Sequence, residues 1–157
     1  MKILGLIEED FVNYKVPCMT VMFPYCDFKC NKDCGQNVCQ NMQLAYSDII
    51  DISEKELVKR YVNNPISEAL VLQGLEPFDS FKDLEDLLKE FSRFSSDQVV
   101  IYTGFYEEEI KDKIQKLKNV YNKIIIKFGR FIPNRDKRYD EILGVWLQSD
   151  NQYAKEV

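Results

Sequence analysis

The chain has 157 residues, a formal net charge of −5, no histidine and five cysteines. This length predicts one domain, residues 1–157, which can bury a hydrophobic core without cross-links. The excess of acidic over basic residues argues against a nucleic-acid partner. No apolar run approaches the roughly 18 residues that a membrane helix needs, and no signal peptide opens the chain. We therefore expect a cytoplasmic protein with reduced thiols and no membrane partner.

Apolar segments rich in β-branched residues alternate with amphipathic segments, which indicates strand-helix-strand units and a parallel sheet. The predicted strands cover residues 19–23, 69–73, 98–103, 123–128 and 142–147, and residues 2–7 are a further candidate. The first predicted helix begins after Ser53, which forms a capping box with Glu56. Two more helices are predicted over residues 80–94 and 106–117. The apolar stripe of the former, which we assign to the core, consists of Leu84, Leu87, Leu88 and Phe91.

Polar and glycine-containing segments follow four of the predicted strands: PYC…CQN, GLEP, TGF and GRF. The carboxyl ends of parallel strands meet at one edge of a sheet, and binding sites collect there. We therefore expect these four segments to share one edge.

Four of the five cysteines lie within PYCDFKCNKDCGQNVCQN, with the spacing C-x3-C-x3-C-x4-C. A structural zinc site is one alternative, but such sites usually pair their cysteines in CxxC units, and this chain has none. Iron-sulfur clusters are held by cysteine thiolates with more variable spacings. The sequence therefore favours an iron-sulfur cluster over zinc. The remaining cysteine, Cys18, precedes an apolar strand and is predicted to be a small core residue.

Several motifs together resemble the radical SAM superfamily. These are a CxxxC pair directly after a strand, a later cysteine followed by a polar residue and Asn, and LQGLEPF after the next strand, which is similar to a GGEP-type segment. The chain is more closely similar to the anaerobic ribonucleotide reductase activating proteins, through VVIYTGF, IIIKFGRFI and the terminal SDNQ. The resemblance runs through most of the chain.

The resemblance implies a 4Fe-4S cluster bound by three cysteines, but the usual CxxxCxxC motif is not kept here. Cys26 and Cys30 are the first two predicted ligands, and the third is either Cys39 or Cys34. Cys39 is favoured because the family places an apolar residue before the third cysteine, against the adenine of S-adenosylmethionine. Val38 suits that position, whereas Asp33 would desolvate a carboxylate there. The polar residue and Asn that follow in the family are matched by Gln40 and Asn41.

The resemblance also implies that S-adenosylmethionine (SAM) binds the iron that has no protein ligand. The predicted SAM-binding residues, besides Val38 and Gln40, are Gln73, Gly74, Glu76 and Thr103. Gly74 would let the backbone approach the methionine moiety, and Glu76 would balance its amino group. Thr103 would donate its hydroxyl to SAM. The family's first glycine is replaced by Gln73, and Leu75 is an added residue.

The implied fold is an α/β partial, open parallel β/α barrel of about five to six strands, since a closed eight-fold barrel needs about 250 residues. The implied function is an activase that uses a 5'-deoxyadenosyl radical to form a glycyl radical on an anaerobic (class III) ribonucleotide reductase, with a low-potential electron donor as a second partner. Two alternatives stay open. One is a radical SAM enzyme acting on a small molecule, as in 7-carboxy-7-deazaguanine synthesis, and the other is a zinc-binding interaction module.

Overall fold

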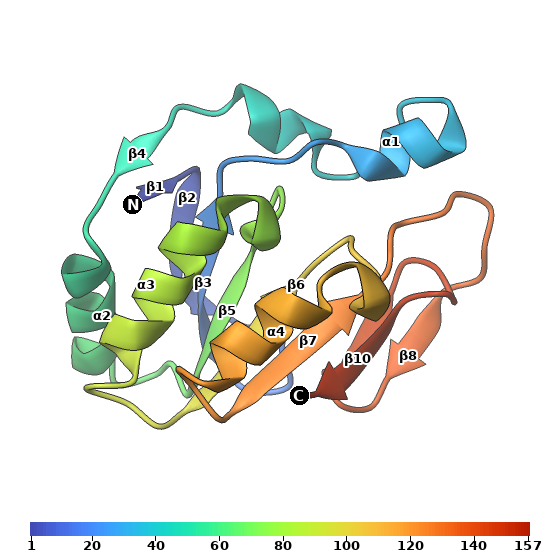
Figure 1. The fold of residues 1–157 in the computed structure, drawn as a ribbon. Coiled ribbons are helices and arrows are strands. Elements are labelled where there is room, and N and C mark those ends of the chain that lie inside the picture. The colour runs from blue at the N-terminus through green and yellow to red at the C-terminus, as the bar shows by residue number, and fades with distance from the viewer.

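The computed structural model describes all residues, 1–157, and its centre is a six-stranded sheet in the order β10-β7-β6-β5-β3-β2 (Figure 1). The four inner strands are parallel: β3 (Cys18–Phe23), β5 (Ala69–Gly74), β6 (Gln98–Tyr102) and β7 (Ile124–Phe128). The edge strands β2 (Gly5–Asp10) and β10 (Tyr153–Glu156) run antiparallel to their neighbours. These two edge strands do not pair with each other, so the sheet is open and forms no closed barrel.

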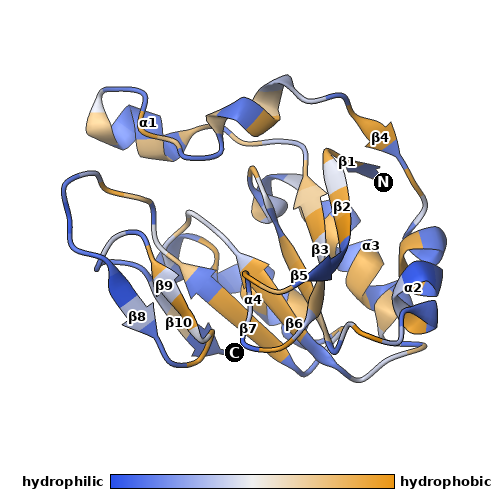
Figure 2. Cartoon of the chain, turned by 180° about the vertical axis from the view of Figure 1, so that it is seen from behind, coloured by the Kyte–Doolittle hydropathy of each residue, from blue (hydrophilic) through white to orange (hydrophobic).

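Helices α2 (Glu54–Asn63), α3 (Phe81–Phe91) and α4 (Lys111–Lys118) cover one face of the sheet (Figure 1). Alternate strand residues such as Leu70, Leu72 and Ile101 pack under these helices, together with the predicted apolar stripe of α3. The intervening residues, such as Val71 and Val100, face a second, smaller core on the other side. Because both faces of the sheet are covered, the inner strands are mainly apolar, as Figure 2 shows.

The second core is covered by residues 11–17 and by a small hairpin near the C-terminus, which supply Tyr14, Leu143 and Leu147. The hairpin consists of β8 (Arg138–Asp140) and β9 (Val145–Leu147). The strand predicted over residues 142–147 is therefore confirmed only for residues 145–147, and it lies in this hairpin and not in the main sheet. Gly144, with φ of 73°, forms the turn that separates residue 142 from β9, and the sixth place in the sheet is taken by β10.

The other predicted strands are confirmed within about one residue, except at the N-terminus. The candidate strand over residues 2–7 is divided: β1 (Lys2–Ile3) pairs with β4 (Ile50–Asp51), and only β2 joins the main sheet. Ser53 caps α2 as predicted, because its Oγ accepts a hydrogen bond from Glu56 N at 3.2 Å. The Glu56 carboxylate, however, accepts from Arg60 and leaves the capping box half formed.

Short helices occupy the loops. The predicted third helix is broken at Ile110 into η3 (Glu107–Glu109) and α4, and η2 (Pro77–Ser80) precedes α3. The cysteine segment forms α1 (Lys29–Cys34), followed by η1 (Met42–Tyr46). Figure 1 shows α1 apart from the helical layer, beyond the edge where the parallel strands end. Among all these helices, none combines the length and the apolar character needed to cross a bilayer.

Candidate metal and cofactor site

A cavity of about 400 Å³ lies at the edge of the sheet where the parallel strands end. Its walls come from the residues that follow β3, β5, β6 and β7, so the prediction that these segments share one edge is confirmed. Residues around β9 and Gln152 complete the wall. Cavities of this volume are typical of small-molecule and cofactor sites.

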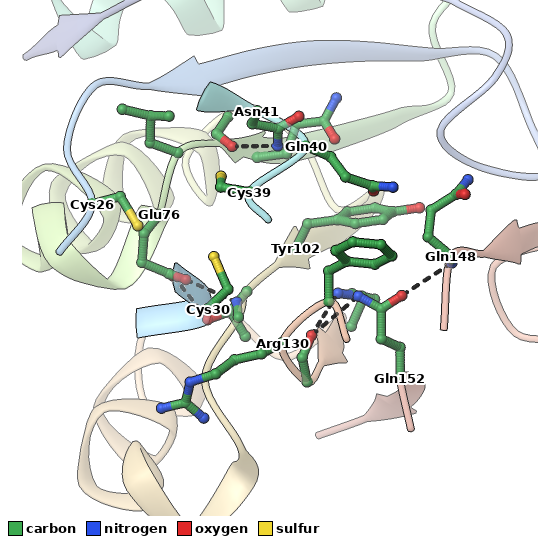
Figure 3. Close-up of a pocket in the computed structure, with 18 of the residues that line it drawn as sticks. Cys26, Cys30, Cys39, Gln40, Asn41, Glu76, Tyr102, Arg130, Gln148 and Gln152 are labelled. Atoms are coloured by element: carbon green, nitrogen blue, oxygen red, sulfur yellow. Dashed lines mark hydrogen bonds between the residues drawn. The ribbon is translucent and has the colours of Figure 1, made fainter. Parts of the chain in front are cut away.

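Most of the predicted site residues line this cavity. Figure 3 shows Cys26, Cys30 and Cys39 on one side and Tyr102, Gln148 and Gln152 on the other. Cys34 and Val38 are not among the lining residues. The predicted residues that do line the cavity are Cys26, Cys30, Cys39, Gln40, Gln73, Gly74, Glu76 and Thr103.

The loop that follows β3 carries the three lining cysteines, and one side chain fixes its shape. Cys30 lies on α1, which ends at Gly35, a residue with φ of 67°. The Asn31 Oδ1 accepts hydrogen bonds from the backbone N–H groups of Val38 and Cys39, both at 2.9 Å. Asn31 thereby folds the chain back so that Cys39 approaches Cys30.

The lining thiols are in surroundings that disfavour a free thiolate. Burial raises the pKa of Cys26 to about 12, and the carboxylates of Glu76 and Asp79 contribute in the same direction. Burial also raises the pKa of Cys30 to about 11, with a further contribution from Cys39. Thiols in such positions ionise when a bound cation balances the new charge. The donor set fits an iron-sulfur cluster, whose irons supply that positive charge.

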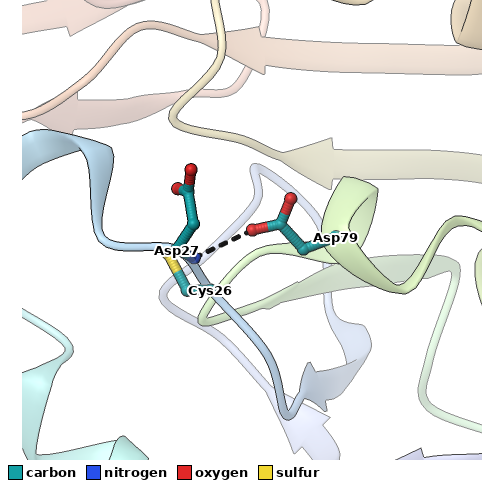
Figure 4. Close-up of side chains that lie close together, drawn as sticks. All are labelled: Cys26, Asp27 and Asp79. Atoms are coloured by element: carbon teal, nitrogen blue, oxygen red, sulfur yellow. Dashed lines mark hydrogen bonds between the residues drawn. The ribbon is translucent and has the colours of Figure 1, made fainter.

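Two exposed carboxylates lie near Cys26. The ligand atoms of Cys26, Asp27 and Asp79 are all within 4.8 Å of one another (Figure 4). The Asp27 N donates to Asp79 Oδ2 at 3.0 Å, which ties the cysteine loop to η2. We interpret this group as a link between loop and helix.

No other trio of cysteine and acidic side chains is so compact, so the sulfurs of Cys26, Cys30 and Cys39 are not all within 4.8 Å of one another. Two thiolates on one zinc ion, each about 2.3 Å from the metal, can be at most about 4.6 Å apart. The three thiols are therefore not arranged as the ligands of one zinc ion unless a side chain moves.

Glu76 is buried at the inner wall and joins two strand ends. Its Oε1 accepts from Thr103 Oγ1 at 2.8 Å and from Phe78 N at 3.1 Å, and its Oε2 accepts from Gly104 N at 2.8 Å. Burial nevertheless raises the pKa of Glu76 to about 7. The Thr103 hydroxyl donates to Glu76 and accepts from Phe105 N at 3.0 Å, so its proton is already used within the protein. The predicted donation from Thr103 to SAM stays a prediction, and it requires the Thr103 hydroxyl to turn away from Glu76.

Gly74 ends β5 in a conformation that other residues avoid, with φ of 106°. A Cβ atom at this position would lie 2.6 Å from the backbone N of Phe23. The carbonyl of Gly74 accepts a hydrogen bond from Asn41 Nδ2 at 2.9 Å, so the end of the cysteine loop is attached to β5. Glycine here lets β3 and β5 approach each other where the cavity begins.

Arg130 holds α1 against the body of the protein. Its buried guanidinium binds both carboxylate oxygens of Glu109 on η3, at 2.6 and 2.9 Å. The Nε lies 3.0 Å from Asp33 on α1, and the guanidinium stacks on the ring of Tyr106. Asp33 therefore forms an ion pair with Arg130, and Cys34 beside it lies outside the cavity lining.

Sequence reasoning missed several residues of this site. Lys127 is a charged residue in the otherwise apolar strand IIIKF. A strand that is buried on both faces rarely contains an unpaired charge, so this lysine was a signal that the sequence offered. Tyr102, whose hydroxyl donates to Asn13 O at 2.6 Å, resembles an ordinary strand residue in the sequence. Asn31 and Arg130 carried no sequence signal, because their roles depend on partners brought close by folding.

The model of the 4Fe-4S single cluster domain family matches residues 16–153, which is most of the chain. The match covers the cysteine loop, all four parallel strands and the segment that contains Gln152. No significant match was found among curated proteins or among solved structures.

Proposed function

Because the chain belongs to the family of 4Fe-4S single cluster domains, we propose that it is a radical SAM enzyme in which Cys26, Cys30 and Cys39 hold the cluster. The observation that carries this proposal is that three thiols, and not the fourth, line one cavity large enough for a cofactor. Single 4Fe-4S clusters usually have four cysteine ligands. Three ligands leave one iron available to a small molecule in the cavity.

When bound, the reduced cluster supplies the electron that cleaves the sulfonium bond of SAM to methionine and a 5'-deoxyadenosyl radical. The protein positions SAM and excludes water from the cavity. The positive φ of Gly74 allows β3 and β5 to approach each other at the cavity wall, and Gln40 and Gln73 offer amide groups there. Tyr102 and Phe105 contribute aromatic surface that excludes water. The open sheet is then a partial barrel of the radical SAM type.

For the substrate, we propose a glycine Cα–H of a partner protein, most simply a class III anaerobic ribonucleotide reductase. The 5'-deoxyadenosyl radical would take the hydrogen atom, which would give 5'-deoxyadenosine and a glycyl radical on the partner. Support comes from the cavity rim, where Val12 is 75% exposed and Trp146 is 62% exposed. Exposed apolar side chains at a site entrance are typical of a surface that meets another macromolecule. A low-potential electron donor would act as the second partner, in the cytoplasm, where thiols stay reduced.

The test begins with anaerobic reconstitution, followed by iron and sulfide analysis and EPR spectroscopy with and without SAM. We expect about four irons per chain, a spectrum that changes on adding SAM, and 5'-deoxyadenosine after addition of dithionite. A colourless protein with one zinc would support the interaction module instead.

A second step adds the reductase subunit and looks for the EPR doublet of a glycyl radical. Formation of that doublet supports the activase. Deoxyadenosine without a doublet, combined with SAM-dependent turnover of a pterin in a small-molecule screen, would instead place the enzyme with the 7-carboxy-7-deazaguanine synthases.

A further inference from the structure

Lys127 is a buried lysine in the wall of the cavity, and it has no carboxylate partner. It lies on β7, where every other residue is apolar, and its side chain is 7% exposed. The Nζ donates one hydrogen bond, to the carbonyl of Gly129 at 2.9 Å, and forms no ion pair. An ammonium group has three protons to donate, so most of its hydrogen-bonding capacity is unused. Burial of such a group is costly unless an opposite charge faces it.

The other two cations of the cavity wall are already paired. Arg130 binds Glu109 and Asp33, and Lys29 lies 3.6 Å from Glu109 and 4.1 Å from the ring centre of Phe105. Lys127 is therefore the one lining cation whose charge no carboxylate within 4 Å balances.

Two groups act electrostatically on Lys127 from neighbouring elements. These are Glu76, at the end of β5, and Cys30, on α1. The Glu76 carboxyl forms its hydrogen bonds with Thr103, Phe78 and Gly104 and no ion pair with Lys127, whereas the Cys30 thiol gains a full negative charge toward Lys127 when it binds a cation. Burial lowers the pKa of Lys127 to about 8, with Glu76 and Cys30 opposing this shift, so the side chain is still mostly protonated at pH 7.

We propose that Lys127 balances the negative charge that arises when Cys30 and its neighbours bind the cluster as thiolates, and that it thereby raises the reduction potential of the cluster. One-electron reduction by an external donor adds one negative charge to the cluster. A fixed positive charge in a low-dielectric wall stabilises this reduced form more than the oxidised form. Lys127 therefore makes the cluster easier to reduce by a biological donor. The inference rests on the proposed cluster ligands.

The test is an EPR-monitored titration of the reconstituted holoprotein with dithionite at pH 7 and without SAM, so that no turnover is involved. Lys127→Met and Lys127→Gln remove the charge with different packing, and Gln keeps a donor for Gly129. The matched control is Lys29→Met, which removes an equal charge beside Cys30 from a partly exposed, carboxylate-paired position. Circular dichroism and iron content are measured for each variant.

We expect both neutral variants at position 127 to make reduction at least tenfold less favourable, a drop of about 59 mV for one electron. Lys29→Met should shift the potential by less than half as much, because solvent and Glu109 screen its charge. Loss of the cluster from both folded position-127 variants, while Lys29→Met keeps it, would also support charge balance.

The inference would be overturned if the neutral position-127 variants had the same cluster reduction potential as the wild type. It would also be overturned if Lys29→Met shifted that potential as much as they do. A drop in Lys127→Met without one in Lys127→Gln would also overturn it, because the effect would then come from packing. Failure of the proposed function is seen separately, as the absence of iron or of a SAM-dependent spectral change in the wild-type protein.

Discussion

Thr103 and Glu76 join the ends of β6 and β5 through a buried hydrogen bond of 2.8 Å between Oγ1 and Oε1. Both side chains are almost fully buried, at 3% exposure each. The contact closes the inner wall of the cavity, beside Cys26 and Cys30 (Figure 3). Both carboxylate oxygens of Glu76 already accept hydrogen bonds from the protein. Glu76 therefore contributes to the shape of the cavity wall as well as to the charge of that wall.

This burial predicts a pH dependence of stability in the cluster-free protein. The pKa of Glu76 in the folded state is about 7, against an ordinary value of 4.5, because burial disfavours the carboxylate. The resulting stabilisation is fully present below pH 4.5 and is lost as the pH rises through about 7. Between pH 5 and 8, wild type should lose up to roughly 3 kcal/mol relative to Glu76→Gln. Urea denaturation under anaerobic conditions measures this difference, and parallel pH profiles for the two proteins would contradict it.

Gly74→Ala should unfold the inner edge of the site. Its Cβ would lie 2.6 Å from Phe23 N and 2.9 Å from the Met22 backbone, at a φ of 106°. We expect a loss of about 3 kcal/mol or more in the free energy of unfolding. Gly35→Ala is the control, because Gly35 also has positive φ but open space around it, so about 1–2 kcal/mol is expected. Similar losses in denaturant titrations of the two variants would show that the close approach at Gly74 does not matter.

Cys39→Ala should lose the cluster, and Cys34→Ala should keep it. The reason is that Cys39 lines the cavity with Cys26 and Cys30, whereas Cys34 does not. Iron and sulfide content after anaerobic reconstitution, together with the EPR signal of the reduced protein, measures the outcome. The reverse pattern would make Cys34 the third ligand and would require α1 to turn toward the cavity.

Asn31→Ala should weaken cluster binding without touching a ligand. The Oδ1 of Asn31 accepts from Val38 N and Cys39 N, and its removal leaves both donors unpaired, at about 1 kcal/mol or more. We expect faster loss of iron to a chelator, measured by the fall in visible absorbance. Gln36→Ala, at an exposed position in the same loop, is the control and should release iron at the wild-type rate. Equal rates for the two variants would contradict this role for Asn31.

The sheet was largely predictable because its signal is local. Strands β3, β5, β6 and β7 are mainly apolar segments, and the loops after parallel strands converge on one edge. The strand predicted over residues 142–147 is shorter than expected and lies outside the main sheet for a tertiary reason. Ile142 and Leu147 are apolar because the hairpin covers the second core, and an apolar run alone does not tell a sheet strand from such a cover.

The sequence by itself determined the identity of the chemistry-bearing groups: four thiols in one loop, no imidazole, and an acid and a threonine directly after two buried strands. The tertiary structure decided which of these groups meet, because the course of the cysteine loop depends on Asn31, Asn41 and Arg130, whose partners are distant or irregularly spaced. It also decided the state of charge around the cavity. Lys127 resembles an ordinary strand lysine in the sequence and is a buried cation without an ion-pair partner only in the folded chain, since burial and electrostatic surroundings are properties of the fold.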